Sequence, residues 1–188
     1  LRFGQLVRKA EPLDLLPVAA FDHHAHHGLR PRRPEQNAPA VAQQGSLAFD
    51  IAPTRDCVAT GGGADCIGRA AASCRAQPGG QTTFGLSFCF SGEAEWWDAR
   101  LNDVYRRLMP REREVEARVA GHYDTPPASR AEALRAMQRA WIPFRDAACA
   151  YERSQWGGGS GGRPATLACL MERTARQSLH LERHLEQQ

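Results

Sequence analysis

Six cysteines, at positions 57, 66, 74, 89, 149 and 169, offer three kinds of chemistry: disulfide bonding, metal coordination and nucleophilic catalysis. They are dispersed along the chain, and no two form the Cys-x-x-Cys pair that zinc sites commonly use. An even number of dispersed cysteines favours disulfides and an oxidising compartment. All six can pair, so none is left over as a catalytic thiol. The competing interpretation is a zinc site.

Glycine-rich breaks between the helical segments indicate how the cysteines pair. One pair lies on either side of the run Gly157–Gly162, a second pair flanks Gly79 and Gly80, and the third closes the short loop that remains. The predicted disulfides are therefore Cys57–Cys66, Cys74–Cys89 and Cys149–Cys169. Each should stabilise the fold by about 2–4 kcal/mol, because it restricts the unfolded chain.

The sequence lacks the patterns that organise common catalytic sites. It has no Gly-x-Ser-x-Gly elbow, no phosphate-binding loop with its lysine and no His-Glu-x-x-His. Two carboxylate pairs, Glu93 with Glu95 and Glu112 with Glu116, are the types of residue that a glycosidase places across a cleft. They stand in arginine-rich helical segments, so we interpret them as solvated helix faces. The sequence predicts a protein that is not an enzyme and needs no cofactor.

Residues 1–48 differ in composition from the rest of the chain. They contain five prolines, no cysteine and a histidine cluster, His23, His24, His26 and His27. A hydrophobic core is hard to build from such a segment, so we predict an extended arm. The histidines could bind a transition metal, but they lack a rigid scaffold, and no physiological metal site is predicted. The arginines Arg30, Arg32 and Arg33 are predicted to contact a partner, either an acidic surface or lipid headgroups.

The remaining residues, 49–188, carry the signals of several helices. Thr82 or Thr83 can cap a long helix, and Ser129–Glu132 is a capping box that opens another. Pro110 should end or kink the first of these helices, and Pro143 should bend the second or break one of its hydrogen bonds. No alternating pattern of any length indicates a strand. We therefore predict an all-α domain, a small helical bundle stapled by disulfides.

Two helical motifs and a following cysteine resemble a known family. The motifs are Asp98-x-x-Leu101-Asn102-x-x-Tyr105 and Gln138-x-x-Trp141-x-x-x-Arg145-Asp146-x-x-Cys149, which Cys169 follows. Together they resemble the LprI-like domain, which is named for a lipoprotein that inhibits lysozyme. The resemblance covers about Cys74 to His184 and implies a small, secreted or periplasmic, disulfide-bonded helical domain. Cys57, Cys66 and the arm have no counterpart in the family pattern.

The polar residues of the two motifs are predicted to form a network inside the bundle. Asp98 and Asn102 share one helical face, and Gln138 and Arg145 share another. If these faces pack together, Asp98 or Asn102 satisfies Arg145, because a buried charge requires a partner. The alternative is a polar cleft that binds a ligand.

Two functions of different kinds follow from these observations. The first is a non-catalytic protein-binding module in the periplasm or outside a bacterial cell, an accessory or structural subunit of an envelope or extracellular assembly that docks through its arm. The alternative, implied by the resemblance, is a lysozyme inhibitor that inserts the loop Gly157–Gly162 with Trp156 beside it. The formal net charge of +3 does not indicate nucleic acid. Any membrane contact is predicted to be peripheral.

Overall fold

The computed structural model describes residues 47–122 and 128–187, and within these ranges the regular elements are all helical. The α-helices are α1 (Ala52–Ala59), α2 (Arg69–Arg75), α3 (Thr83–Val119), α4 (Arg130–Ser154) and α5 (Gly162–Glu186), and the 3₁₀ helices are η1 (Gly63–Cys66) and η2 (Ala120–His122). The all-α prediction is confirmed. None of the described helices has a stretch long and apolar enough to cross a lipid bilayer. Residues 1–46, with the histidine cluster, Arg30, Arg32 and Arg33, lie outside the described ranges, so the arm stays a prediction.

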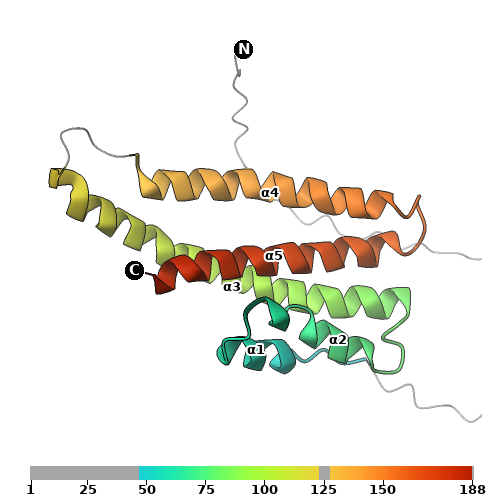
Figure 1. The fold of residues 1–188 in the computed structure, drawn as a ribbon. Coiled ribbons are helices and arrows are strands. Elements are labelled where there is room, and N and C mark those ends of the chain that lie inside the picture. The colour runs from blue at the N-terminus through green and yellow to red at the C-terminus, as the bar shows by residue number, and fades with distance from the viewer. Residues whose placement is uncertain (1–46, 123–127, 188) are drawn as a thin grey trace, which may run out of the picture. The chain divides into compact units, whose positions relative to one another are not determined.

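The three long helices lie side by side, with α5 between α3 and α4 (Figure 1). The short helices α1 and α2 pack at the first half of α3. α5 therefore supplies the surface on which the other long helices meet. α4 has far less contact with α3 than with α5.

Two clusters of buried side chains form the core. The first joins α3, α4 and α5 and contains Leu101, Val104, Leu108, Met109, Ala131, Leu134, Leu181 and Leu185. The second joins α2, α3 and α5 and contains Ala71, Trp97, Met171 and Ala175. Trp97, Leu101, Val104 and Leu108 follow one another at steps of three or four residues, so they form one stripe of α3 that links the two clusters. Each large apolar side chain contributes about 1.5–3 kcal/mol when it is fully buried.

Three disulfides join the cysteines in the predicted pairs, Cys57–Cys66, Cys74–Cys89 and Cys149–Cys169. The Cα atoms of the pairs lie 5.5 Å, 5.6 Å and 5.5 Å apart, within the usual range for disulfides. No cysteine is free. The structure therefore leaves no thiolate for the zinc site that was the competing interpretation.

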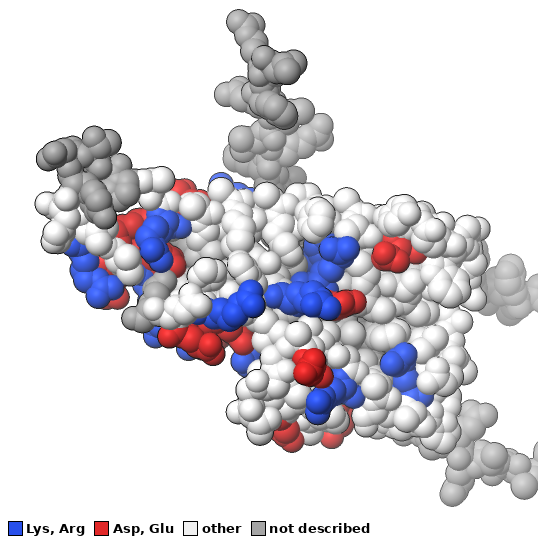
Figure 2. Space-filling view, viewed as in Figure 1, with Lys and Arg blue, Asp and Glu red and all other residues white. Residues whose placement is uncertain are grey.

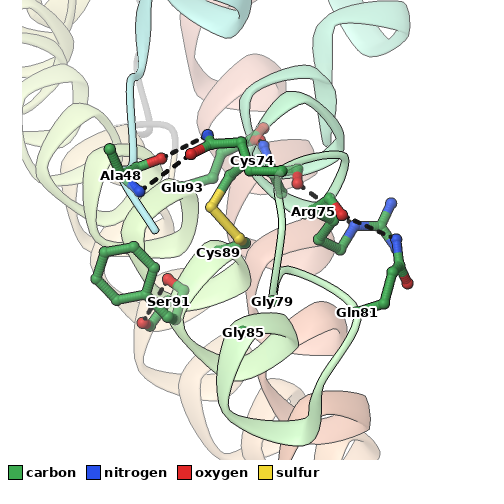
Figure 3. Close-up of a disulfide and its surroundings, with 12 residues drawn as sticks. Ala48, Cys74, Arg75, Gly79, Gln81, Gly85, Cys89, Ser91 and Glu93 are labelled. Carbon is green, nitrogen blue, oxygen red and sulfur yellow. Dashed lines mark hydrogen bonds between the residues drawn. A yellow bond between two sulfur atoms is a disulfide. The ribbon is translucent and has the colours of Figure 1, made fainter. Parts of the chain in front are cut away.

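The Cys74–Cys89 disulfide ties the end of α2 to the start of α3, and the backbone comes very close there (Figure 3). A Cβ atom on Gly85 would lie 2.2 Å from the carbonyl oxygen of Gly79, so only glycine fits at position 85. The hydroxyl of Thr82 accepts a hydrogen bond from the Gly85 N–H at 3.0 Å and caps α3, as the sequence predicts.

The carboxylate of Glu93, on α3, is completely buried beneath the start of α2. Its Oε1 accepts hydrogen bonds from the Gly68 N–H at 2.6 Å and the Trp97 indole N–H at 3.1 Å. Its Oε2 accepts one from the Ala71 N–H at 2.8 Å. The N-terminus of a helix has unpaired N–H groups and a positive dipole end, both of which favour an anion. The interpretation of Glu93 as part of a solvated face was therefore wrong.

A second carboxylate of α3 binds the start of α4 in a similar way. Glu116 accepts hydrogen bonds from the Ala131 N–H at 2.7 Å and the Ser129 hydroxyl at 2.9 Å. These bonds hold the pKa of Glu116 below its ordinary value. The Ser129 hydroxyl also accepts the N–H of Glu132, as the predicted capping box requires. Glu112, one turn earlier, is buried and forms an ion pair with Arg130, so this pair was also misinterpreted as a solvated face.

Neither internal proline ends its helix. α3 continues through Pro110 to Val119, and α4 continues through Pro143 to Ser154. Pro110 removes one backbone hydrogen bond, but Met109 and Glu112 on either side of it are buried. The contacts of this part of α3 offset the loss.

Replacing Glu93 by Gln should lower the free energy of unfolding by about 1.5–3 kcal/mol, because charged hydrogen bonds become neutral and an amide NH₂ faces a backbone N–H. Glu95, two residues later, is exposed and offers the matched control: Glu95→Gln should change stability by less than about 0.5 kcal/mol. Urea unfolding of the oxidised protein measures both. Equal small losses in the two variants would contradict the structural role of Glu93.

The stabilising effect of Glu116 should depend on pH. Because its pKa is lowered in the folded state, its contribution is present above the ordinary pKa of 4.5 and is lost as the pH falls through the lower folded value. The difference in unfolding free energy between the wild type and Glu116→Gln should therefore be larger at neutral pH than at about pH 3. Glu114→Gln, at an exposed position of α3, is the control and should show no such trend. A difference that stays constant with pH would refute the contact.

Candidate functional site

Trp156, the described member of the predicted partner-binding residues, lies in the turn between α4 and α5 and is 53% exposed. Gly157 and Gly158 have φ values of +52° and +87°, in the left-handed region that favours glycine. A Cβ atom on Gly161 would lie 2.1 Å from the Trp156 ring, so the indole rests directly against the Gly161 backbone. The turn is therefore shaped around this tryptophan and holds it at the end of the hairpin.

A groove of about 550 Å³ lies next to Trp156, between α4 and α5. We call it the hairpin groove; its lining residues are Glu152, Trp156, Ala165, Ala168, Cys169, Glu172, Arg173 and Arg176. Because Cys169 contributes to the lining, the Cys149–Cys169 disulfide fixes the distance between the two walls. The groove is therefore largely preformed.

The charges of the hairpin groove are of both signs. Glu172 forms an ion pair with Arg176 at 2.8 Å, one turn apart on α5. The guanidinium of Arg173 lies 5.4 Å from the centre of the Phe144 ring, a cation–π contact between α5 and α4. On the side of the molecule seen in Figure 1 and Figure 2, basic side chains gather over α5, while much of the surface over α4 is neither acidic nor basic. Such a mixed surface suits contact with another protein.

A second pocket, of about 440 Å³, lies between the Cys57–Cys66 loop and α5. Arg100 and Glu182 line it and form an ion pair, with Arg100 Nε 2.6 Å from Glu182 Oε1. Burial lowers the pKa of His180, and the nearby His184 and Arg183 lower it further. Among the residues that the structure describes, no group of three or more His, Cys, Asp or Glu side chains is placed to hold a metal ion.

The predicted polar network between the two motifs is not formed. Asp98 and Asn102 are both exposed and hydrogen-bond to each other at 2.9 Å along α3. Arg145 instead pairs with the adjacent Asp146 at 2.8 Å and lies 5.0 Å from the centre of the Trp141 ring. The prediction that Asp98 or Asn102 satisfies Arg145 was wrong.

The packing of α3 explains this correction. The stripe that includes Trp97 and Leu101 faces the core, which turns the neighbouring positions 98 and 102 toward solvent. α5 lies where α4 was expected, so Gln138 finds its partner there: Gln177 donates a hydrogen bond to Gln138 at 2.6 Å. Sequence spacing identified the faces of the helices but could not identify which helix would cover them.

Several residues that organise the structure carried no recognisable signal in the sequence. Glu93 and Glu116 accept hydrogen bonds from helix N-termini that lie far from them in the sequence. Glu182 of α5 forms an ion pair with Arg100 of α3. A buried glutamate and an exposed one look alike in an arginine-rich segment. The only local sign was Ser129, which is recognisable as a cap and also contacts Glu116.

Comparison with known proteins agrees with these features. The family model described as "Lysozyme inhibitor LprI" matches residues 74–181, a range that contains α3, α4 and two of the three disulfides. An uncharacterized protein of Rhizobium meliloti (strain 1021) is 31% identical over 101 residues, which cover 54% of this chain and 72% of that protein. No solved structure matches the chain. The chain belongs to the family of the lysozyme inhibitor LprI.

Proposed function

We propose that the protein is a non-catalytic inhibitor that binds lysozyme in the periplasm or outside the cell. The observation that carries this proposal is the family match over residues 74–181. The three disulfides support the location, because such bonds form and persist in oxidising compartments. The buried carboxylates support a non-catalytic role, because both oxygens of Glu93 are already occupied by N–H donors of the protein itself.

The end of the α4–α5 hairpin is the surface that we assign to this binding. It presents Trp156, a residue type that often dominates the energy of protein interfaces. The contact with Gly161 and the Cys149–Cys169 disulfide hold this surface before the partner arrives, which reduces the entropic cost of binding. The hairpin groove beside it offers both carboxylates and guanidinium groups to polar side chains of lysozyme.

Net charge bears on how this binding should respond to salt. Common lysozymes are basic, and this chain has a formal net charge of +3. Long-range repulsion between two basic proteins is screened by salt. Binding through Trp156 and its apolar surroundings should therefore not weaken when the ionic strength is raised.

The test is lysozyme-catalysed clearing of a bacterial cell-wall suspension, with and without the purified protein. The wild type should slow the clearing, and Trp156→Ser should weaken inhibition by at least about tenfold, as expected for the loss of an aromatic anchor. Phe84→Ser is the matched control, because Phe84 is an exposed aromatic residue at the start of α3. Clearing at an unchanged rate in an excess of wild-type protein would refute the function. Equal inhibition by Trp156→Ser and the wild type would place the contact elsewhere on the protein.

The other predicted function, an accessory subunit of an envelope assembly, depends on docking through residues 1–48. It stays a prediction, and it is compatible with membership of the inhibitor family.

A further inference from the structure

The second pocket, of about 440 Å³, lies apart from the residues of the hairpin end that we assign to lysozyme, except for Arg176, which lines both. We call it the loop pocket, because one of its walls is the loop that the Cys57–Cys66 disulfide closes and the other is α5. Its volume falls in the range of small-molecule sites, about 300–1,000 Å³. The loop wall precedes the residues that the family model matches, 74–181. The family match therefore does not account for this pocket.

The loop wall has a fixed backbone and few side chains. A Cβ atom on Gly62 would lie 2.6 Å from both sulfurs of the Cys57–Cys66 disulfide, so the backbone packs directly on the disulfide. Gly61 and Gly63, on either side, have φ values of +81° and +55°. A Cβ atom on either of them would meet no atom of another part of the chain within 4 Å. Because glycines also let a ligand approach the backbone closely, this wall stays open to a molecule in the pocket.

The α5 wall is basic. Arg176, His180 and Arg183 line the pocket from one side of α5, at steps of four and three residues. Nη2 of Arg183 lies 3.2 Å from Nδ1 of His180, and a guanidinium only donates, so Nδ1 accepts and the ring proton of the neutral imidazole is on Nε2. Arg183 forms no ion pair with a carboxylate within the described ranges. Its other N–H groups and the His180 Nε2–H are therefore open to an acceptor.

Two glutamates also line the loop pocket, but they do not cancel its positive charge. Glu182 is paired with Arg100, whose Nε lies 2.6 Å from Glu182 Oε1 and whose Nη2 donates to Oε2 at 3.2 Å. Glu172, the ion-pair partner of Arg176, lines the hairpin groove instead. Glu186, the last residue of α5, is exposed. With three arginines against two glutamates, the lining carries more positive than negative charge, which favours an anion.

We propose that the loop pocket binds a small organic anion, with its carboxylate or phosphate group against Arg183 and His180. The fork of guanidinium N–H groups matches two oxygens of either head group. The uncharged body of the ligand rests between Val58 and Leu179, which line the pocket and are only partly buried by the protein itself. The volume suits a body of roughly the size of one sugar ring. This site is independent of the proposed binding of lysozyme.

Titration of the oxidised full chain, followed by the NMR shifts of its backbone amides, tests the proposal. The probes are glucuronate, glucose 6-phosphate and glucose, added at constant ionic strength. They share one ring and differ in the head group, so they separate carboxylate from phosphate and both from the ring itself. At least one of the two anions should cause saturable shifts at Gly61, Gly63 and Leu179. Glucose should bind at least about fivefold more weakly than that anion, because it lacks the charged acceptor.

Three variants separate the head-group contact from a general effect of charge. Arg183→Gln should weaken binding of the anion by at least about fivefold, and the fold should persist because Arg183 is exposed. Glu186→Gln, in the same pocket, removes a negative charge and should bind at least as tightly as the wild type. Arg113→Gln, at an exposed arginine of α3, should bind like the wild type.

Four outcomes would overturn the proposal: no saturable shift with either anion, equal binding of glucose and the anions, unchanged binding by Arg183→Gln, or an equal loss in Arg113→Gln. Lysozyme takes no part in the measurement, so its result does not depend on the proposed function.

Discussion

The buried carboxylate of Glu93 is the interaction on which the N-terminal half of the domain depends. It receives the N–H groups of Gly68 and Ala71 at the start of α2 and the indole N–H of Trp97, and it lies near the Cys74–Cys89 disulfide (Figure 3). A carboxylate removed from water is costly unless its oxygens are hydrogen-bonded, and here each oxygen has a donor. These bonds fix α2 on α3 at the point where Trp97 enters the second core cluster. The Cys74–Cys89 disulfide joins the same two helices.

At the other end of α3, carboxylates again bind the start of a helix, but the helix that they hold, α4, is more exposed. Glu116 and Glu112 hold the start of α4, and the Cys149–Cys169 disulfide holds its far end. Between these attachments α4 buries little. α4 is therefore fixed at both ends while one of its faces remains available for contact. This explains how a helix with so few buried side chains keeps a defined position on α5.

These two properties of α4 have different functional consequences. The turn that follows it presents Trp156 beside the preformed hairpin groove, which is the surface we assign to lysozyme. Along the helix itself Phe144 and Tyr151 remain exposed, and the Phe144 ring contacts Arg173, which also lines the groove. The groove relies on the rigidity that the Cys149–Cys169 disulfide gives to the hairpin.

The sequence by itself determined the all-α class, the three disulfides, the caps Thr82 and Ser129, and the resemblance to the inhibitor family. These features depend on residues close together in the chain, or on cysteines whose partners the glycine breaks restrict. Only the tertiary structure decided that α5 lies between α3 and α4, which left Arg145 without Asp98 or Asn102 and gave it Asp146 and Trp141. It also decided that Glu93 is buried while Glu95 is exposed. The physical reason is that helical periodicity fixes which residues share a face, whereas the partner of that face is set by competition among all the helices for a limited buried surface.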